Sequence, residues 1–229
     1  MKHILLILTI CLLPISLSAG RHTYADQSVL REGKIIKIRV SQTGVHAITY
    51  NELKEWGLQP DKVRVLGYGG TMLSENFTKH KWDDLPSVPF YMHKGSDGVF
   101  NQGDYILFYA QGVIGWQYAA DKWHHTRNPY SDYGYYFLSD SAGQQRLINV
   151  SEPLNDEQAY EVDWFTNYQL HEVEKVNLLD KTGVSGGGRE FYGEALQGEN
   201  ATLKITFNTP HLFTDMPMMC VAHVAATST

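Results

Sequence analysis

Apolar and polar residues alternate along much of the chain, and this pattern predicts a protein built mainly of β-strands. In residues 34–41, Ile36, Ile38 and Val40 alternate with charged side chains, the period that a half-buried strand produces. Glycine, serine and aspartate turns separate similar runs, which predict strands over residues 45–50, 62–68, 88–94, 104–110, 133–139 and 145–150. The pattern therefore favours a mainly β fold of the β-sandwich type.

One short helix is predicted directly after the second of these strands. Thr49 is placed to cap it, and Glu52, three residues later, completes a capping box. Leu53 and Trp56 lie three residues apart on one face, and Gly57 is suited to end the helix. We therefore expect one helix within an otherwise β-rich domain.

The order of segments predicts a signal peptide followed by two β-rich domains. Residues 1–19 have a basic start, a short apolar run and small residues at the end, which is the layout of a cleaved secretory signal. Residues 20–152 form the predicted N-terminal β-rich domain, with the polar, proline-containing stretch 151–158 at its boundary. Residues 153–229 begin a second β-rich domain, which we expect to be completed by polypeptide beyond it. Two strands are expected in this domain, over residues 201–210 and 216–226.

Charge and cysteine content narrow the range of functions. The net charge of −6 argues against a nucleic-acid partner, because phosphate binding needs a basic surface. The chain has two cysteines, and Cys11 lies inside the predicted signal, which leaves Cys220 without a partner for an internal disulfide. Stability is therefore expected to come from packing, in keeping with the aromatic content of 12%.

One loop carries several oxygen-bearing side chains and raises the question of a calcium site. Asp97, Asn101 and Asp104 are candidate ligands, but their spacing differs from the alternate-residue pattern of an EF-hand loop. Gly98 and Gly103 suit backbone turns with positive φ, and Asp104 is suited to accept hydrogen bonds from loop amides. We predict a structural turn, with calcium binding as the alternative, and we assign no metal or cofactor site.

Cys220 and His223 are the only pair near each other that suggests nucleophilic catalysis, which needs a base within hydrogen-bond reach of the thiol. Residues three apart on a strand point to opposite faces, so the spacing does not favour a dyad. Met218, Cys220, Ala222 and Val224 form one apolar stripe, and Cys220 is predicted to be a small buried hydrophobe. No catalytic residue is assigned in this chain.

The remaining histidine and aromatic motifs have structural interpretations. Residues 171–174 read HEVE, half of a zinc-protease motif, but Lys175 stands where the second histidine belongs, which indicates a charged, solvated strand face. His124 and His125 are expected in a polar loop. The tyrosine-rich stretch 130–137 is interpreted as aromatic residues paired across neighbouring strands, with a glycan- or protein-binding face as the alternative.

Taken in order, several stretches resemble the N-terminal region of the PorU family, the gingipain-like cysteine peptidases that act as sortases of the type IX secretion system. The stretches are GKIIKIRVSQTGVHAITYNELK, VRVLGYGGTMLSENF, DDLPSVPFYMHKGSDGVFNQGDYILFYAQG, YSDYGYYFL, HEVEKVNLL and REFYGE. They extend over nearly all of the chain that follows the predicted signal.

The resemblance implies an outer-membrane surface protein held by the barrel protein PorV together with other secretion-system components. It implies an enzyme that removes the C-terminal signal domain of secreted cargo proteins and joins the cargo to an anionic lipopolysaccharide. The cysteine and histidine of that family belong to a caspase-like α/β domain that follows the β-rich region, so no catalytic residue is transferred to this chain. Two alternatives stay open: a stand-alone surface β module that binds glycan or protein, and the N-terminal part of a secreted gingipain-like protease.

Overall fold

The computed structural model describes residues 24–76, 79, 82–151, 161–178, 188, 190–199 and 201–226. The predicted signal peptide, residues 1–19, lies outside this set, as does all of the predicted domain boundary except Ser151. Over the described ranges, no helix has the length and apolar character needed to cross a membrane.

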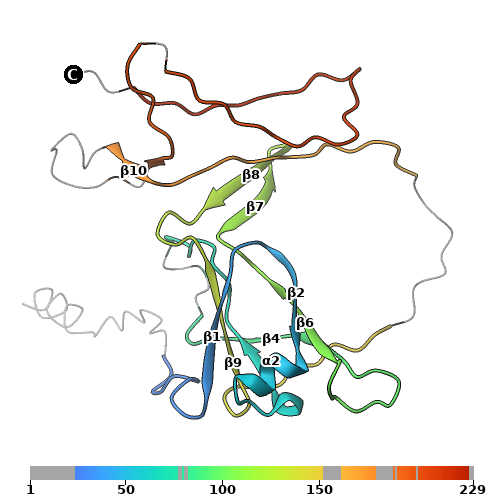
Figure 1. The fold of residues 1–229 in the computed structure, drawn as a ribbon. Helices are drawn as coiled ribbons and strands as arrows, with labels where there is room; N and C mark the ends of the chain where they lie inside the picture. Colours follow the sequence, from blue (N-terminus) through green and yellow to red (C-terminus); the bar gives the residue numbers. More distant parts are fainter. Residues whose placement is uncertain are drawn as a thin grey trace, which may run out of the picture.

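The predicted mainly β fold is confirmed, and its centre is a pair of antiparallel sheets (Figure 1). The first sheet has four strands in the order β1 (Ile35–Val40), β9 (Gly134–Ser139), β3 (Arg64–Leu66) and β4 (Ser87–Val88). The second sheet has three strands in the order β2 (Gly44–Thr49), β6 (Tyr105–Ala110) and β5 (Phe90–His93). Five of these strands fall where alternation predicted them.

The two sheets bury one hydrophobic core between them, as a β-sandwich does. Phe108 of β6 and Tyr136 of β9 meet across the core with ring centroids 5.6 Å apart in an edge-to-face arrangement. The core contains Val40, Ile48, Leu53, Leu58, Val63, Val65, Phe90, Phe100, Ile106, Phe108, Ala110, Tyr136 and Leu138. Because these residues come from both sheets and from the helix, the sandwich folds as one packed unit.

Helix α2 (Tyr50–Glu55) has the predicted start and end. The Thr49 hydroxyl accepts the Glu52 N–H at 3.2 Å, and the Glu52 carboxylate accepts the Thr49 N–H at 2.7 Å, which completes the capping box. At the other end Gly57 has φ +71°, and the N–H groups of Gly57 and Leu58 return to the carbonyls of Lys54 and Leu53. This is a Schellman motif. A short 3₁₀ turn, η1 (Pro60–Lys62), follows.

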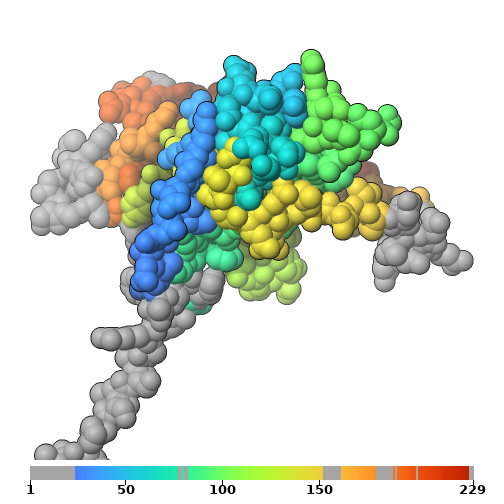
Figure 2. Space-filling model, turned by 90° about the horizontal axis from the view of Figure 1, so that it is seen from below, coloured from blue at the N-terminus to red at the C-terminus, as the bar shows by residue number. Residues whose placement is uncertain are grey.

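The segment after β9 lies against the segment after α2, on the face seen in Figure 2. The Asp140 carboxylate accepts the Gln59 N–H at 2.9 Å, and the Gln145 amide donates to two carbonyls near η1 at 3.0 Å each. The strand predicted over residues 145–150 is not formed. A single parallel bridge joins Leu147 to Phe90 of β5, flanked by hydrogen bonds between the Phe90 backbone and those of Arg146 and Ile148.

Pro89 divides the predicted strand 88–94 into two strands that belong to different sheets. Ser87–Val88 pairs with β3, and Phe90–His93 pairs with β6. Proline has no N–H to give to a ladder, so it suits the point where the chain leaves one sheet for the other.

The hairpin of β7 (Ile114–Ala119) and β8 (Lys122–Arg127) was not predicted. Its two-residue turn, Ala120 and Asp121, has φ of +50° and +59°, the conformation of a type I′ turn. That turn usually carries asparagine and glycine, and neither is present. Most of the hairpin's side chains are exposed on both faces, so there is no burial to produce an apolar alternation. His124 and His125 therefore lie on a strand and not in a loop.

The C-terminal half contains little regular structure among the residues that are described. β10 (Val176–Asn177) pairs with β11 (Phe191–Tyr192), and this short pair lies beyond the hairpin in Figure 1. No strand is assigned within residues 201–226, so the strands predicted there are wrong. A strand needs a neighbour for its backbone groups, and no described segment provides one. The predicted division into two domains stays a prediction.

Candidate functional site

The loop before β6 is a hydrogen-bonded turn. The Asp97 carboxylate accepts the Val99 N–H at 3.0 Å and the Asn101 side-chain amide at 2.7 Å. These two hydrogen bonds hold the pKa of Asp97 below its ordinary value, the Val99 contact having the larger effect. The buried Asp104 carboxylate accepts the Asn101 N–H at 2.8 Å. The predicted turn is confirmed, since the Asp97 and Asp104 carboxylates accept hydrogen bonds within the loop and the Asn101 side chain donates one to Asp97.

Three glycines give this loop its path. Gly95, Gly98 and Gly103 have φ of +57°, +72° and +101°, in the region that side chains other than glycine rarely adopt. Among the described residues, no group of three or more His, Cys, Asp or Glu side chains is placed to hold a metal ion.

We predict that removing the Asp104 carboxylate destabilises the fold while calcium leaves it unchanged. Asp104→Ala leaves the Asn101 N–H without its acceptor in a partly buried loop, which costs about 1–3 kcal/mol of unfolding free energy. Thermal unfolding with millimolar calcium or a chelator checks the second part. A calcium-dependent rise of several degrees that Asp97→Ala abolishes would contradict the turn interpretation.

Cys220 is exposed, which corrects the prediction that it is buried. Met218 and Val224, from the same predicted apolar stripe, are also exposed. The reason is that residues 216–226 form no strand in the structure and nothing described covers them. Within residues 201–226 no hydrogen bond joins Cys220 to His223. The structure therefore gives no support for a thiol–imidazole pair here.

The tyrosine-rich stretch 130–137 contacts the neighbouring strand β1, but its partners there are cations and not the aromatic side chains that were predicted. The Lys37 ammonium lies 3.9 Å from the Tyr135 ring centroid, and the Arg39 guanidinium lies 4.8 Å from that of Tyr133. Tyr136 points into the core, where burial raises the pKa of its hydroxyl. These contacts fix the outer face of the first sheet.

A junction between the β7–β8 hairpin and residues 161–178 brings together aromatic and charged side chains. The Trp116 ring lies 5.3 Å from that of His125 and 6.1 Å from that of Tyr168, measured between centroids. The His125 Nε2 lies 3.0 Å from the Glu172 carboxylate. Sequence reasoning missed this junction. The aromatic residues of the hairpin were its only local signal, because its partners lie more than forty positions further along the chain.

The charged motif at residues 171–174 takes part in this junction. The prediction that it forms a solvated strand face is wrong. The His171 Nε2 lies 2.8 Å from the Glu194 carboxylate, which ties the motif to the segment that contains β11. Glu172 and Glu174 are half-buried, and no strand is assigned over these residues. The motif therefore connects segments, and no metal-binding role follows from it.

Burial raises the pKa of Glu174, and the hydrogen bond and charge of Glu172 raise it further, while Arg127 opposes the shift. One Glu174 carboxylate oxygen and the Arg127 Nε are shielded from solvent without a hydrogen-bond partner. The Arg127 guanidinium pairs instead with Asp132 at 3.0 Å. Ionisation of the Glu174 carboxyl is therefore unfavourable within the junction.

We predict that Glu174→Gln stabilises the junction at neutral pH. The folded state favours the protonated form of a carboxyl whose pKa is raised above its ordinary value of 4.5. The contribution of this carboxyl to folding stability therefore falls as pH rises from 4.5 through the folded pKa. Glutamine stays neutral, so its advantage is largest at pH 7 and disappears in acid. Melting curves from pH 4 to 8 and hydrogen exchange in residues 161–178 measure this. The exposed Glu199→Gln serves as control, and destabilisation by Glu174→Gln at pH 7 would contradict the account.

The C-terminal part of the chain exposes a large amount of apolar surface. Residues 201–226, here called the exposed C-terminal segment, form an extended layer above the hairpin in Figure 1. Its exposed large apolar side chains are Leu203, Ile205, Phe207, Leu212, Phe213, Met216, Met218, Met219, Val221 and Val224. Many exposed large apolar side chains within one segment are typical of a surface that contacts another protein. This segment is the candidate interface of the molecule.

Comparison with known proteins finds a likeness to a solved structure. No protein-family model matches the chain, and no curated protein matches it. The crystal structure of dimeric latent PorU from Porphyromonas gingivalis matches 74% of this chain at 35% identity, with a TM-score of 0.57. The match covers 15% of that solved chain, so the present chain spans a small part of its length. The likeness extends to sequence as well as fold.

Proposed function

We propose that this chain forms the non-catalytic N-terminal portion of a sortase. The premise is that it is a PorU-related type IX secretion component with a PorU-like N-terminal region. The observation that carries the proposal is the 35% identity to PorU over 74% of the chain, together with the family motifs in their order. The sortase removes the C-terminal signal domain of cargo proteins and attaches the cargo to the cell surface.

The chemistry belongs to a peptidase domain with a cysteine nucleophile and a histidine base, which form and resolve a thioester with the cargo. Two features support a non-catalytic role for the present residues. Cys220 is exposed and has no hydrogen bond to His223, and the described residues bring no other cysteine near a base. We infer that the sandwich supports the peptidase domain.

The exposed C-terminal segment is the surface that binds the chain's own downstream peptidase domain. Its apolar side chains need a partner that removes them from water, and each fully buried one contributes about 1.5–3 kcal/mol. The complete protein sits at the outer-membrane surface, where PorV, other secretion-system components and secreted cargo are its partners.

The direct test is deletion of the gene in its own host. Cargo proteins are then expected to keep their C-terminal signal domains, which immunoblotting and mass spectrometry of the secreted fraction detect, and the intact gene is expected to restore maturation. Normally processed cargo in the deletion strain would contradict the sortase role. That outcome would favour an ordinary secreted gingipain-like protease or a stand-alone binding module.

A matched pair of variants in the complete protein tests the role of the exposed segment. Val221 is 67% exposed in the segment and Val45 is 68% exposed on the sandwich, so serine removes equal apolar surface from each. Val221→Ser is expected to lower the melting temperature of the complete protein, and Val45→Ser is expected to leave it unchanged. Equal effects would argue against the segment as the contact surface.

A further inference from the structure

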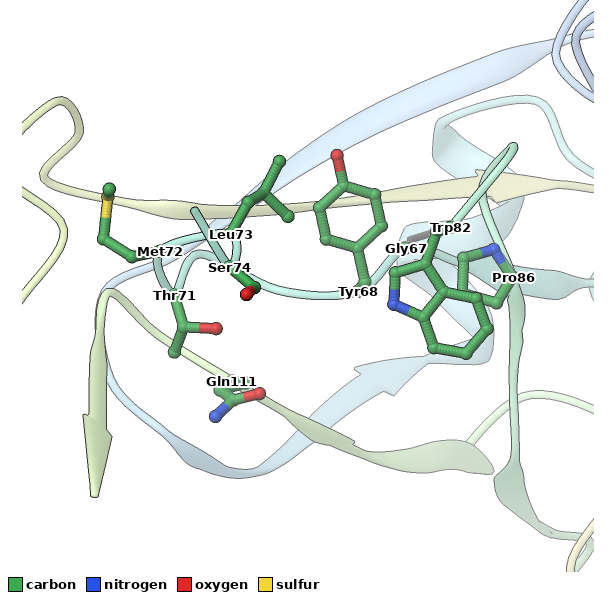
Figure 3. A pocket seen from close by; sticks show the side chains of 9 residues that line it. All are labelled: Gly67, Tyr68, Thr71, Met72, Leu73, Ser74, Trp82, Pro86 and Gln111. Atoms are coloured by element: carbon green, nitrogen blue, oxygen red, sulfur yellow. The ribbon is translucent and has the colours of Figure 1, made fainter. Parts of the chain in front are cut away.

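A hollow of about 390 Å³ opens at the end of the sandwich, beside the turn that follows β3 (Figure 3). It is lined by Gly67, Tyr68, Thr71, Met72, Leu73, Ser74, Trp82, Pro86 and Gln111. Its size falls within the range of small-molecule sites. Neither the resemblance to PorU nor the proposed function assigns it a role.

Polar groups gather on one side of the hollow. Figure 3 shows the hydroxyls of Thr71 and Ser74 and the carboxamide of Gln111 near one another. The Gln111 backbone is fixed, because its carbonyl accepts the Gly70 N–H at 3.1 Å and its N–H donates to the Tyr136 hydroxyl at 2.8 Å. Within the described residues the side chains of Thr71 and Gln111 make no hydrogen bond, so a donor and acceptor pair is held in place for a ligand.

Aromatic surface lies on another side. Trp82 is 52% exposed and Tyr68 is 40% exposed, and Figure 3 shows both rings standing at the hollow beside Pro86. An indole or phenol ring that stays partly exposed offers a flat apolar face, together with an N–H or O–H at its edge. The hollow therefore presents an apolar wall opposite hydrogen-bonding groups.

The lining determines what kind of ligand fits. None of the described residues that line it is charged, so against these residues an anion or a cation would lose its hydration without gaining a counter-charge. A purely apolar ligand would cover the Thr71 and Gln111 groups without satisfying them. With ~30 Å³ for each water, the hollow has the volume of ~13 waters, which is more than enough to admit a single sugar ring.

We propose that this hollow binds one neutral pyranose residue of a glycan. The less polar C–H face of the ring packs on Trp82, and its hydroxyls exchange hydrogen bonds with the Thr71 hydroxyl and the Gln111 carboxamide. The site is independent of the sortase role, because it rests only on the lining of the hollow.

Saturation-transfer NMR and calorimetry on the full chain test the proposal, with methyl glycosides of mannose, galactose, glucose and N-acetylglucosamine as probes. At least one is expected to bind with a Kd of about 1–10 mM. Trp82→Ala is expected to weaken binding about 10-fold, and the near-isosteric Thr71→Val and Gln111→Leu about 5-fold each. Trp82→Phe keeps an aromatic face and is expected to retain part of the affinity. Trp123→Ala, which removes an exposed tryptophan from the hairpin, is the control and is expected to bind normally.

Failure of the wild-type chain to bind any probe at 50 mM would overturn the proposal. So would binding that Trp82→Ala leaves intact, or that Trp123→Ala reduces equally. Melting curves of each variant separate loss of binding from loss of fold. Cargo maturation is measured separately, so a failure here leaves the sortase proposal standing.

Discussion

Gly134→Ala is expected to lower the free energy of unfolding by about 3 kcal/mol, although it adds a single methyl group. A Cβ at this position would lie 2.5 Å from the Gln111 carbonyl oxygen and 3.0 Å from the Gly70 nitrogen. Both are backbone atoms held by a hydrogen bond to each other, so neither moves aside without breaking it. The turn after β3, the end of β6 and the start of β9 meet at this point.

Gly98→Ala is the control that separates steric overlap from backbone strain. Gly98 has φ +72°, but nothing lies within 4 Å of its Cβ position, so only the conformational cost of about 1 kcal/mol is expected. Chemical denaturation of both variants gives the comparison. A Gly134→Ala protein that is as stable as Gly98→Ala would show that the three segments are not in close contact.

Phe108→Ala is expected to destabilise the sandwich by about 3–5 kcal/mol. Phe108 is 2% exposed, it faces Tyr136 of the other sheet, and its partner in the ladder is the fully buried Phe90. Its removal leaves a cavity between the sheets and also ends the edge-to-face contact, which alone contributes about 0.5–1.5 kcal/mol.

The neighbouring residue provides the control. Tyr109 is 62% exposed on the outer face of the same strand, so Tyr109→Ala is expected to change stability by less than about 0.5 kcal/mol. Denaturation midpoints of the two variants, with unchanged slopes, measure the difference. If Tyr109→Ala were the more damaging change, the strand would face the other way and the core would be assigned to the wrong side.

Short sequence patterns predicted helix α2 and strand β1, because each pattern lies within residues close together in the chain. The capping box of Thr49 and Glu52 acts within four residues, and the alternation in β1 reports directly which side chains are buried. The β7–β8 hairpin was missed for the converse reason: its turn lacks the usual residues and its strands are exposed on both faces. Residues 201–210 and 216–226 were predicted as strands because their side chains suit strands, but pairing depends on a neighbour that a local pattern does not reveal.

The candidate sites also differ in whether their residues lie close together or far apart in the sequence. The loop of Asp97, Asn101 and Asp104 was predicted as a turn from its own residues, and the hydrogen bonds of its side chains are local. The hairpin junction and the hollow beside Trp82 combine side chains far apart in the sequence. In the hollow, Thr71 and Gln111 approach each other only because the segments around Gly70, Gln111 and Gly134 meet. No spacing rule within one stretch of sequence predicts such a meeting.

The most direct test of the proposed function is hydrogen exchange of the exposed C-terminal segment. The exchange is compared between this chain alone and the complete sortase that we propose contains it. In the chain alone, amides of residues 201–226 are expected to exchange rapidly, and those of β1 and β9 slowly. In the complete protein the segment is expected to slow by about 100-fold or more, because the peptidase domain covers it. Equally rapid exchange of the segment in both proteins would contradict the account.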